Sequence, residues 1–526
     1  MGWPGWTRVP GQLARASEIA TVLWSSGFRW LVAALGLRVC VSMGCRLFCA
    51  TRLRQCPHHA DMALPLPDRM RQALERLGPT FVKVGQMVAL RPDYVPLEYA
   101  QALRRLHDRV SPFPGSEARR VVEQELGRPL ADVFAEFDEE PFAAASLSQV
   151  HRAVLPDGRP AAVKVQRPGI AEQMRRDLEL LAFLARRLER RRPQTLGFHP
   201  AATVAELAET TRRELDFRQE ARTGLRVRAA FAGNAHIVIP WIDRERTTAR
   251  VLTMQLVEGT PPAPAAQLRA AGLDPDRLLR VGVEATVEQL FQLGLFHADP
   301  HPGNLLFLPG DRVCFLDFGM FGRLRPRDRR RVGYMVWALV DGDYDAVAER
   351  LLGFARLTPD ATPDRFREAL EEVVEDWYAG DTDGSVAQLL LRELALGARH
   401  GVVFPRELML VARALVGINA TITLIAPDTR FSDLLQPALP TLREALLPGI
   451  HGLTQAVERH RFDYLELVTD LPDLIPEIVA HLREPPSPAP DATTVARRHL
   501  PTATTAALLA GAVAGLAGYA ARRSRN

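Results

Sequence analysis

Hydrophobic and polar positions divide the chain into helical and strand-rich stretches. Helical spacing of apolar residues, with Pro and Gly between the runs, extends over 65–130 and predicts long helices at 170–192 and 200–231. Between these helices the period changes, and polar turn residues separate short apolar runs. The strand-rich stretches are 142–155, 161–166, 237–257 and 304–317. The pattern therefore predicts β-hairpins within a mainly helical chain.

The first sixty residues are apolar stretches interrupted by arginines. Arg29, Arg38 and Arg46 recur every eight or nine positions, so no uninterrupted apolar span of about twenty residues forms here. Two interpretations stay open for 1–60, namely a helix that lies in a membrane interface and a helix that docks on the protein core.

The other end of the chain has a different pattern. A Pro-rich linker at 484–501 precedes the charge-free segment 502–521, which is long enough to cross a hydrocarbon core of about 30 Å. This segment is rich in Ala, so a surface or tail helix is the alternative. Gly511 and Gly515 would let a second helix approach closely, which makes a homodimer through this helix a further expectation.

Composition and charge narrow the class of protein. The chain has 526 residues, of which 47% are hydrophobic and 24% charged, enough for a large interior in roughly two to four units. Its 66 basic and 62 acidic residues leave a net charge of +4, too dilute for a general nucleic-acid binder. Five cysteines in this length suggest a reducing compartment. We expect a folded protein without a nucleic-acid partner, its body on the cytoplasmic side.

Lysine is almost absent from the sequence. Of the 66 basic residues only Lys83 and Lys164 are lysines, and the other 64 are arginines. A position that keeps lysine should need a compact charge with three rotatable donors, which the planar guanidinium cannot supply. Both lysines are therefore candidate functional residues.

The clearest chemical motif lies between 297 and 319. Asp299 precedes Asn304 by five residues and Asp317, of the Asp-Phe-Gly triplet, by eighteen. This is the layout of a kinase catalytic centre, in which one Asp lies at the reacting phosphate while an Asn and a second Asp hold Mg²⁺ between phosphate oxygens. We assign Asp299 as catalytic, Asn304 and Asp317 as metal ligands, and ATP and Mg²⁺ as cofactors.

A second motif lies upstream, around Lys164. The strand AAVKVQ carries this lysine, and the preceding loop, which in a kinase covers the phosphates, contains Ala143, Ala144, Ala145 and Ser146. Alanine enters positive φ less readily than glycine, so this nucleotide-binding loop should be stiffer than a Gly-rich one.

The carboxylate partner of Lys164 should come from the segment ELDFRQE. On a straight helix Asp216 and Glu220 share a face, while Glu214 points well over 100° away. We assign Glu220 to Lys164, as the third member of the catalytic set.

Taken together, these motifs resemble the UbiB/AarF family of atypical kinase-like proteins over about residues 65–440. The matching segments are KVGQ at 83–86, AAAS at 143–146, VKVQRPG from 163, ELDFRQEA from 214, HADPHPGN from 297, and the Asp-Phe-Gly triplet. The resemblance implies that Lys83 and Gln86 belong to a regulatory helical extension folded over the active site, and that Lys83 meets Glu214 and Asp216. It also implies an ATP-hydrolysing core that supports isoprenoid quinone biosynthesis at a membrane.

The expected fold is α+β, a bilobal kinase-like fold with a small β-rich N-lobe, a helical C-lobe, a helical N-terminal extension and a C-terminal apolar helix. The expected regions are 1–60, the extension 61–135, the N-lobe 136–258, the C-lobe 259–483, the linker 484–501 and the apolar helix 502–521.

An ordinary protein kinase is disfavoured by the same sequence. Ala298 replaces the arginine that pairs with an activation-loop phosphate, and no Ala-Pro-Glu triplet follows Gly319. A small-molecule or lipid kinase and a nucleotide-binding scaffold with little turnover stay open beside the ATPase. The expected partners are ATP, a membrane lipid or quinone precursor, and quinone-biosynthesis enzymes.

Overall fold

The computed structural model describes the chain in several ranges, which are 10–35, 37, 64–89, 97–106, 111–191, 200–341, 343–378, 386–429, 431–439 and 442. The chain divides into two compact units, Met1–Pro448 and Gly449–Asn526, and every described residue belongs to the first. The predicted linker, the apolar helix 502–521 and the end of the predicted C-lobe lie outside the described residues.

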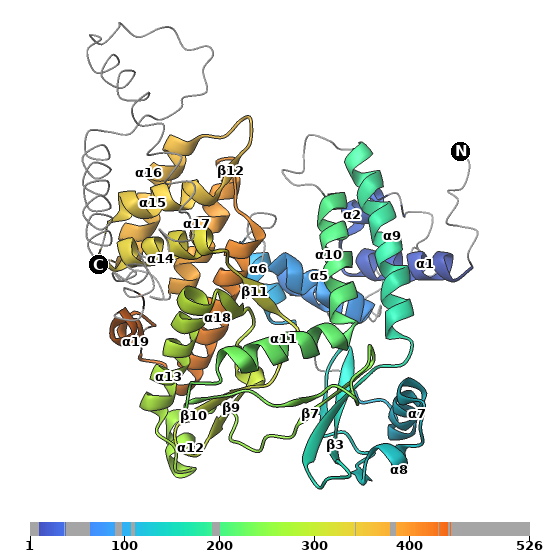
Figure 1. Ribbon diagram of the computed structural model, residues 1–526. Helices are drawn as coiled ribbons and strands as arrows, with labels where there is room; N and C mark the ends of the chain where they lie inside the picture. The colour runs from blue at the N-terminus through green and yellow to red at the C-terminus, as the bar shows by residue number, and fades with distance from the viewer. Residues whose placement is uncertain are drawn as a thin grey trace, which may run out of the picture. The chain divides into compact units, whose positions relative to one another are not determined.

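The N-lobe contains an antiparallel sheet with strands in the order β1-β3-β4-β7-β6 and β2 paired to β3. Figure 1 labels β3 and β7 of this sheet. The strands are β1 Glu136–Phe137, β2 Ala143–Ala144, β3 Ser148–Val154, β4 Pro160–Gln166, β6 Ile242–Asp243 and β7 Val251–Gln255. The predicted hairpin is present, because β3 and β4 pair from Ser148↔Gln166 to Val154↔Pro160. The predicted strand 142–155 is split into β2 and β3 by a tight turn.

Strand β4 is covered on both faces, and this decides where Lys164 points. Val163 and Val165 pack in one apolar cluster with helices α7 (Gly115–Leu126) and α8 (Leu130–Val133), whereas Ala162 packs in another with α11 (Phe217–Ala230). Side chains alternate along a strand, so Lys164 shares the face of Ala162 and points toward α11.

The predicted single helix at 200–231 is wrong. Helix α10 (Pro200–Glu214) ends before α11 begins, and Asp216 is the N-cap of α11. The Asp216 carboxylate accepts the backbone N–H of Arg218 at 3.2 Å. Asp is a preferred N-cap residue, because its side chain satisfies an amide that the new helix leaves unpaired. Glu214 and Glu220 therefore lie on different helices and can face different partners.

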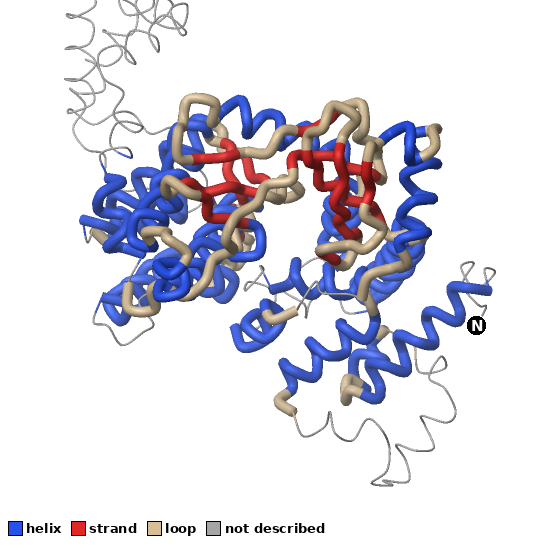
Figure 2. The backbone as a smooth tube through the Cα atoms, turned by 90° about the horizontal axis from the view of Figure 1, so that it is seen from below, coloured by secondary structure: helices blue, strands red, loops and turns tan. Residues whose placement is uncertain are grey.

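The C-lobe is mainly helical, and its described strands pair in three small sheets, none of which joins the N-lobe sheet (Figure 2). Its helices are α12 Ala265–Ala270, α13 Pro275–Val287, α14 Pro326–Asp341, α15 Tyr344–Phe354, α16 Pro363–Tyr378, α17 Val386–Arg399, α18 Arg406–Ile425 and α19 Phe431–Leu435. Its strands are β8 Leu295–His297, β9 Leu305–Leu308, β10 Arg312–Phe315, β11 Phe321–Arg323, β12 Arg356–Leu357 and β13 Val402–Val403. The predicted hairpin at 304–317 corresponds to β9 and β10, and β10 also pairs in parallel with β5 (Ile237–Val238). The predicted α+β class with two lobes is confirmed.

Helix α18 is the most apolar long helix of the described residues. It has the length and hydropathy of a membrane span, but 61% of the relevant window is buried. Its residues Leu408, Val411, Ile418 and Ile422 belong to the main apolar cluster of the C-lobe. We interpret α18 as the central core helix of this lobe.

The N-terminal extension contributes helices α1 (Pro10–Ser25), α2 (Arg29–Ala34), α4 (Leu66–Leu77), α5 (Pro79–Ala89) and α6 (Leu97–Arg104). One apolar cluster joins them to α9 (Ile170–Arg191), and Ile19 and Ala20 of α1 are buried in it. Two interpretations of residues 1–60 were open, a helix in a membrane interface and a helix docked on the protein core. Helix α1 is docked on the protein core.

Arg15 of α1 forms hydrogen bonds with both α9 and α4. Its Nε and Nη2 donate to the two carboxylate oxygens of Asp177 on α9, at 2.8 and 2.9 Å, and Nη2 also donates to the carbonyl of Leu77 at 2.6 Å. The Asp177 side chain is only 1% exposed. Without Arg15, a buried carboxylate would lose its cation.

We predict that Arg15→Met lowers the free energy of unfolding by about 3–5 kcal/mol, because it leaves the buried Asp177 charge unpaired. Urea denaturation measures this value. The matched control is Arg175→Met on α9, whose exposed pairs with Glu172 and Glu179 should cost less than about 1 kcal/mol. Equal effects of the two substitutions would show that the Arg15 pair does not hold α1 in place.

Candidate functional site

The predicted catalytic Asp299 lies in the loop between β8 and β9. The side-chain amide of Asn304 donates to the Asp299 carbonyl at 3.1 Å, and the Asp299 N–H donates to Nδ1 of His297 at 3.1 Å. Residues Pro302–Asn304 form a 3-10 turn that returns the chain to β9. The loop backbone is thus fixed from both ends around Asp299.

His297 is a buried neutral imidazole. Burial lowers the pKa of His297 to about 4, although the nearby Asp317 and Asp299 carboxylates oppose this shift. Since Nδ1 accepts the Asp299 N–H, the ring proton is on Nε2, which has no hydrogen-bond partner among the described residues. His297 therefore acts as an acceptor that holds the loop of Asp299.

The two lobes meet at Lys164. Its Nζ lies 2.9 Å from both carboxylate oxygens of Glu220 on α11 and 3.7 Å from Oδ2 of Asp317. Burial by itself would lower the pKa of Lys164, but the Glu220 and Asp317 carboxylates outweigh it and raise this pKa. Lys164 stays charged and links Glu220 of α11 to Asp317, the predicted metal ligand of the C-lobe.

Asp317 is ionised in this environment. Burial by itself would raise its pKa, but the charge of Lys164 and the Gly319 N–H, which donates to Oδ1 at 2.7 Å, lower this pKa to about 2. The following Phe318 is 1% exposed and packs on α11 at Gly224. A Cβ on Gly224 would lie 3.0 Å from Phe318 and 2.6 Å from Ile242, so glycine is needed for this approach. The Asp-Phe-Gly triplet is thereby held against the helix that carries Glu220.

The predicted metal ligands suit Mg²⁺. The Asp317 carboxylate is charged, and Asn304 uses its amide nitrogen for the Asp299 carbonyl, which leaves its amide oxygen as a ligand atom. Mg²⁺ prefers oxygen ligands and is commonly bound by one or two protein groups together with phosphates. Within the described ranges no cluster of three or more His, Cys, Asp and Glu could hold a metal by itself. The residues therefore fit a magnesium ion held jointly with a nucleotide.

The predicted nucleotide-binding loop is a tight turn at the edge of the N-lobe sheet. Ala143 and Ala144 form β2, and the Ala145 N–H donates to the Ser148 carbonyl at 2.7 Å. Ala143 is exposed, whereas Ser146 is 3% exposed. Exposure therefore decreases along the loop, from Ala143 at the surface through the partly buried Ala144 and Ala145 to the buried Ser146.

The second lysine, Lys83, lies on α5 and faces α10. Its Nζ is 3.1 Å from Oε2 of Glu214, and both side chains are mostly buried, 18% and 13% exposed. Asp216, which the family resemblance also placed at Lys83, instead caps α11 and pairs with Arg218, Nε to Oδ1 at 2.8 Å. The break between α10 and α11 separates the two carboxylates.

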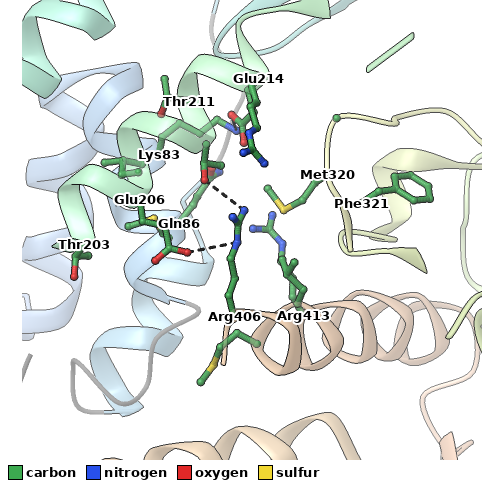
Figure 3. Close-up of a pocket in the computed structure, with 17 residues that line it drawn as sticks. Lys83, Gln86, Thr203, Glu206, Thr211, Glu214, Met320, Phe321, Arg406 and Arg413 are labelled. Carbon is green, nitrogen blue, oxygen red and sulfur yellow. Dashed lines mark hydrogen bonds and ion pairs between the residues drawn. The ribbon is translucent and has the colours of Figure 1, made fainter. Parts of the chain in front are cut away.

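A pocket of about 180 Å³ lies between α5, α10, the Asp-Phe-Gly turn and α18 (Figure 3). The lining residues are Lys83, Gln86, Met87, Thr203, Glu206, Leu207, Thr210, Thr211, Arg213, Glu214, Gly319, Met320, Phe321, Arg406, Met409, Leu410 and Arg413. The pocket is adjacent to the predicted metal site through Gly319. Gln86, which the sequence placed with Lys83, lines it too.

One residue at the site was not predicted from the sequence. Arg413 of α18 places its Nη2 2.6 Å from Oδ2 of Asp299. The sequence did contain a feature that could have drawn attention to Arg413. It is the only charged residue between Leu408 and Ile425, in an otherwise apolar stretch. Its partner is 114 positions away, and no local pattern could connect the two.

Comparisons with known proteins identify the family of this chain. Residues 105–351 match the family model of the ABC1 atypical kinase-like domain, which defines the class of protein. A Marinobacter nauticus protein named "Probable protein kinase UbiB" is 34% identical over 82% of this chain and 79% of its own length. A Xanthomonas oryzae pv. oryzae protein of the same name is 32% identical over 80% of this chain and 74% of its own. The chain belongs to the UbiB family of atypical kinase-like proteins.

A solved structure is also similar to this chain. It is the complex of Rv3197 with erythromycin from Mycobacterium tuberculosis. The two sequences are 25% identical, the TM-score is 0.48, and the match covers 74% of this chain and 98% of the Rv3197 chain.

The depressed pKa of His297 predicts a pH dependence of stability. Below the unfolded-state value of about 6.5, the unfolded chain binds a proton that the folded chain does not. The contribution of His297 to the free energy of unfolding is therefore full above pH 6.5 and falls by about 3 kcal/mol as the pH drops toward 4. Denaturation of wild type and His297→Asn across this range measures it. The variant should have a flatter pH profile, and equal slopes would contradict the burial of a neutral imidazole.

Proposed function

We propose that this chain is an ATP-hydrolysing atypical kinase-like protein that supports isoprenoid quinone biosynthesis at a membrane. The observation that carries the proposal is the position of Lys164, which contacts Glu220 and lies close to Asp317. Phosphoryl transfer needs phosphates held by a lysine beside metal-binding carboxylates, and this arrangement provides both groups.

Each residue has a distinct role in this proposal. Lys164, oriented by Glu220, contacts the nucleotide phosphates, and the turn at Ala143–Ser146 covers them. Asp317 and Asn304 hold Mg²⁺, which neutralises phosphate charge when bound. Asp299 lies where the terminal phosphate reacts and orients the attacking oxygen. The Gly319 N–H and Nδ1 of His297 keep the two aspartates in place.

The Lys83–Glu214 pair supports hydrolysis over transfer to a protein. This pair fixes α5 against α10, and α18 lines the pocket beside it. An ordinary kinase leaves this side open for a peptide. The covered arrangement admits water or a small acceptor, and Lys83 and Gln86 regulate access.

The quinone and membrane parts of the proposal come from the family. The relatives carry the UbiB name, and the apolar segment 502–521 has the length of a membrane span. We propose a membrane-associated protein with its catalytic body on the cytoplasmic side, acting with quinone-biosynthesis enzymes on a membrane lipid or quinone precursor.

Two measurements test this proposal together. Purified protein with Mg²⁺ and ATP should release ADP and phosphate, and cells that lack the gene should lose their isoprenoid quinone. ADP without free phosphate, accompanied by a phosphorylated lipid or small molecule, would indicate a kinase instead. No ADP at all would indicate a nucleotide-binding scaffold.

We predict that Lys164→Arg strongly reduces ATP turnover although it keeps the charge. The planar guanidinium is larger than the ammonium that both Glu220 oxygens contact at 2.9 Å, so it cannot keep this geometry and reach the phosphates. The steady-state rate of ADP release measures the effect. Arg159→Lys, at an exposed pair with Asp157, is the matched exchange and should leave the rate unchanged. Wild-type turnover in Lys164→Arg would remove Lys164 from the phosphate site.

A further inference from the structure

Arg413 lies among several carboxylates, and only one of them is its partner. It lines the same pocket as Glu206 and Glu214, yet its guanidinium bonds Asp299 of the catalytic loop, Nη2 to Oδ2 at 2.6 Å. Arg406, seven residues earlier, lies on the same face of α18 and pairs with Glu206 at 3.4 Å. Figure 3 shows both guanidinium groups reaching from α18 toward the pocket. The two arginines therefore have separate partners, and that of Arg413 is the proposed catalytic carboxylate.

The contact is well placed to fix the Asp299 side chain. The side chains of Arg413 and Asp299 are 15% and 26% exposed, so water competes only partly for the pair. A charge-assisted hydrogen bond of this length is among the stronger polar contacts. Gly417, one turn after Arg413, lies against Pro300, where a Cβ would approach to 2.8 Å. Thr421 donates to the Pro300 carbonyl at 3.5 Å. Helix α18 thus packs closely on the catalytic loop and carries Arg413 to a defined position.

The loop backbone and the carboxylate have different supports. His297 and Asn304 hold the N–H and the carbonyl of Asp299. Neither contacts its carboxylate in the structure, and among the described residues Arg413 is the partner of that group. One carboxylate oxygen is engaged by Arg413, and the other stays available to an attacking oxygen.

We propose that Arg413 is a positioning residue for the reaction at Asp299. It orients the carboxylate and offsets its charge where a polyanionic nucleotide binds, from a helix outside the motifs that define the kinase-like site. This inference rests on the proposed ATP turnover.

The test compares Arg413→Met, Arg413→Lys and Asp299→Asn with wild type in ATP turnover. Arg413→Met should lower kcat roughly 10- to 100-fold, the range expected when a reacting group is misplaced, while the KM for ATP changes little. Arg413→Lys, which keeps a cation, should recover part of the loss. Adding Arg413→Met to Asp299→Asn should cause no further decrease in kcat, because one residue acts through the other.

Arg246→Met is the control for loss of an equally buried arginine. The Arg246 side chain is 16% exposed and pairs with Asp243 at 2.8 Å in the N-lobe, where its Nε also donates to the Val133 carbonyl. The Arg246→Met substitution should lower thermal stability about as much as Arg413→Met does, and it should leave kcat unchanged.

Three results would overturn the inference. The first is a wild-type kcat in Arg413→Met, the second is a loss that multiplies with that of Asp299→Asn, and the third is an equal fall of kcat in Arg246→Met. If the wild-type protein released no ADP, the proposed function would be refuted, and this inference would be refuted with it.

Discussion

The ion pair between Lys164 and Glu220 is the contact on which the arrangement of the site depends. Glu220 is buried and the Lys164 side chain is mostly buried, 6% and 17% exposed, and both carboxylate oxygens contact the ammonium at 2.9 Å. Breaking such a pair by removing one partner is costly, because a charge stays behind in a place with little water. The ammonium is therefore fixed at the junction of the lobes, 3.7 Å from Asp317.

Several features of the fold place this pair. The alternation of side chains along β4 turns Lys164 toward α11, and the N-cap at Asp216 starts that helix so that Glu220 lies in its first turn. Gly224, one turn later, lets Phe318 pack against the same helix and brings Asp317 close. A single helix thus positions both Glu220, the partner of Lys164, and the Asp-Phe-Gly triplet.

Chain composition and motif spacing were sufficient to predict much of the site. The scarcity of lysine singled out Lys83 and Lys164, and the structure places each of them beside a glutamate. The spacing of Asp299, Asn304 and Asp317 predicted one loop and one hairpin, and both are present. The prediction of the loop and the hairpin succeeded because it concerns residues close in sequence, where turns and strands limit the geometry.

Contacts between distant segments could not be predicted in this way. The helical period continues through residues 214–220, so the pattern gave one straight helix and did not show that the Asp216 cap divides it. Arg413 and Arg15 have partners 114 and 162 positions away, and an arginine-rich sequence offers many equivalent candidates for such pairs. Only the packing of α18 and α1 selects them.

In the proposed function, Lys164, Glu220 and Asp317 form a site for magnesium-bound ATP. Calorimetric titration of ATP into wild type and Asp317→Asn, with and without Mg²⁺, tests it most directly. The variant removes a charge at the metal while it keeps the size of the side chain, so magnesium should strengthen ATP binding in wild type and lose most of this effect in the variant. The same magnesium-dependent affinity for ATP in both proteins would show that Asp317 does not belong to a site for magnesium-bound ATP.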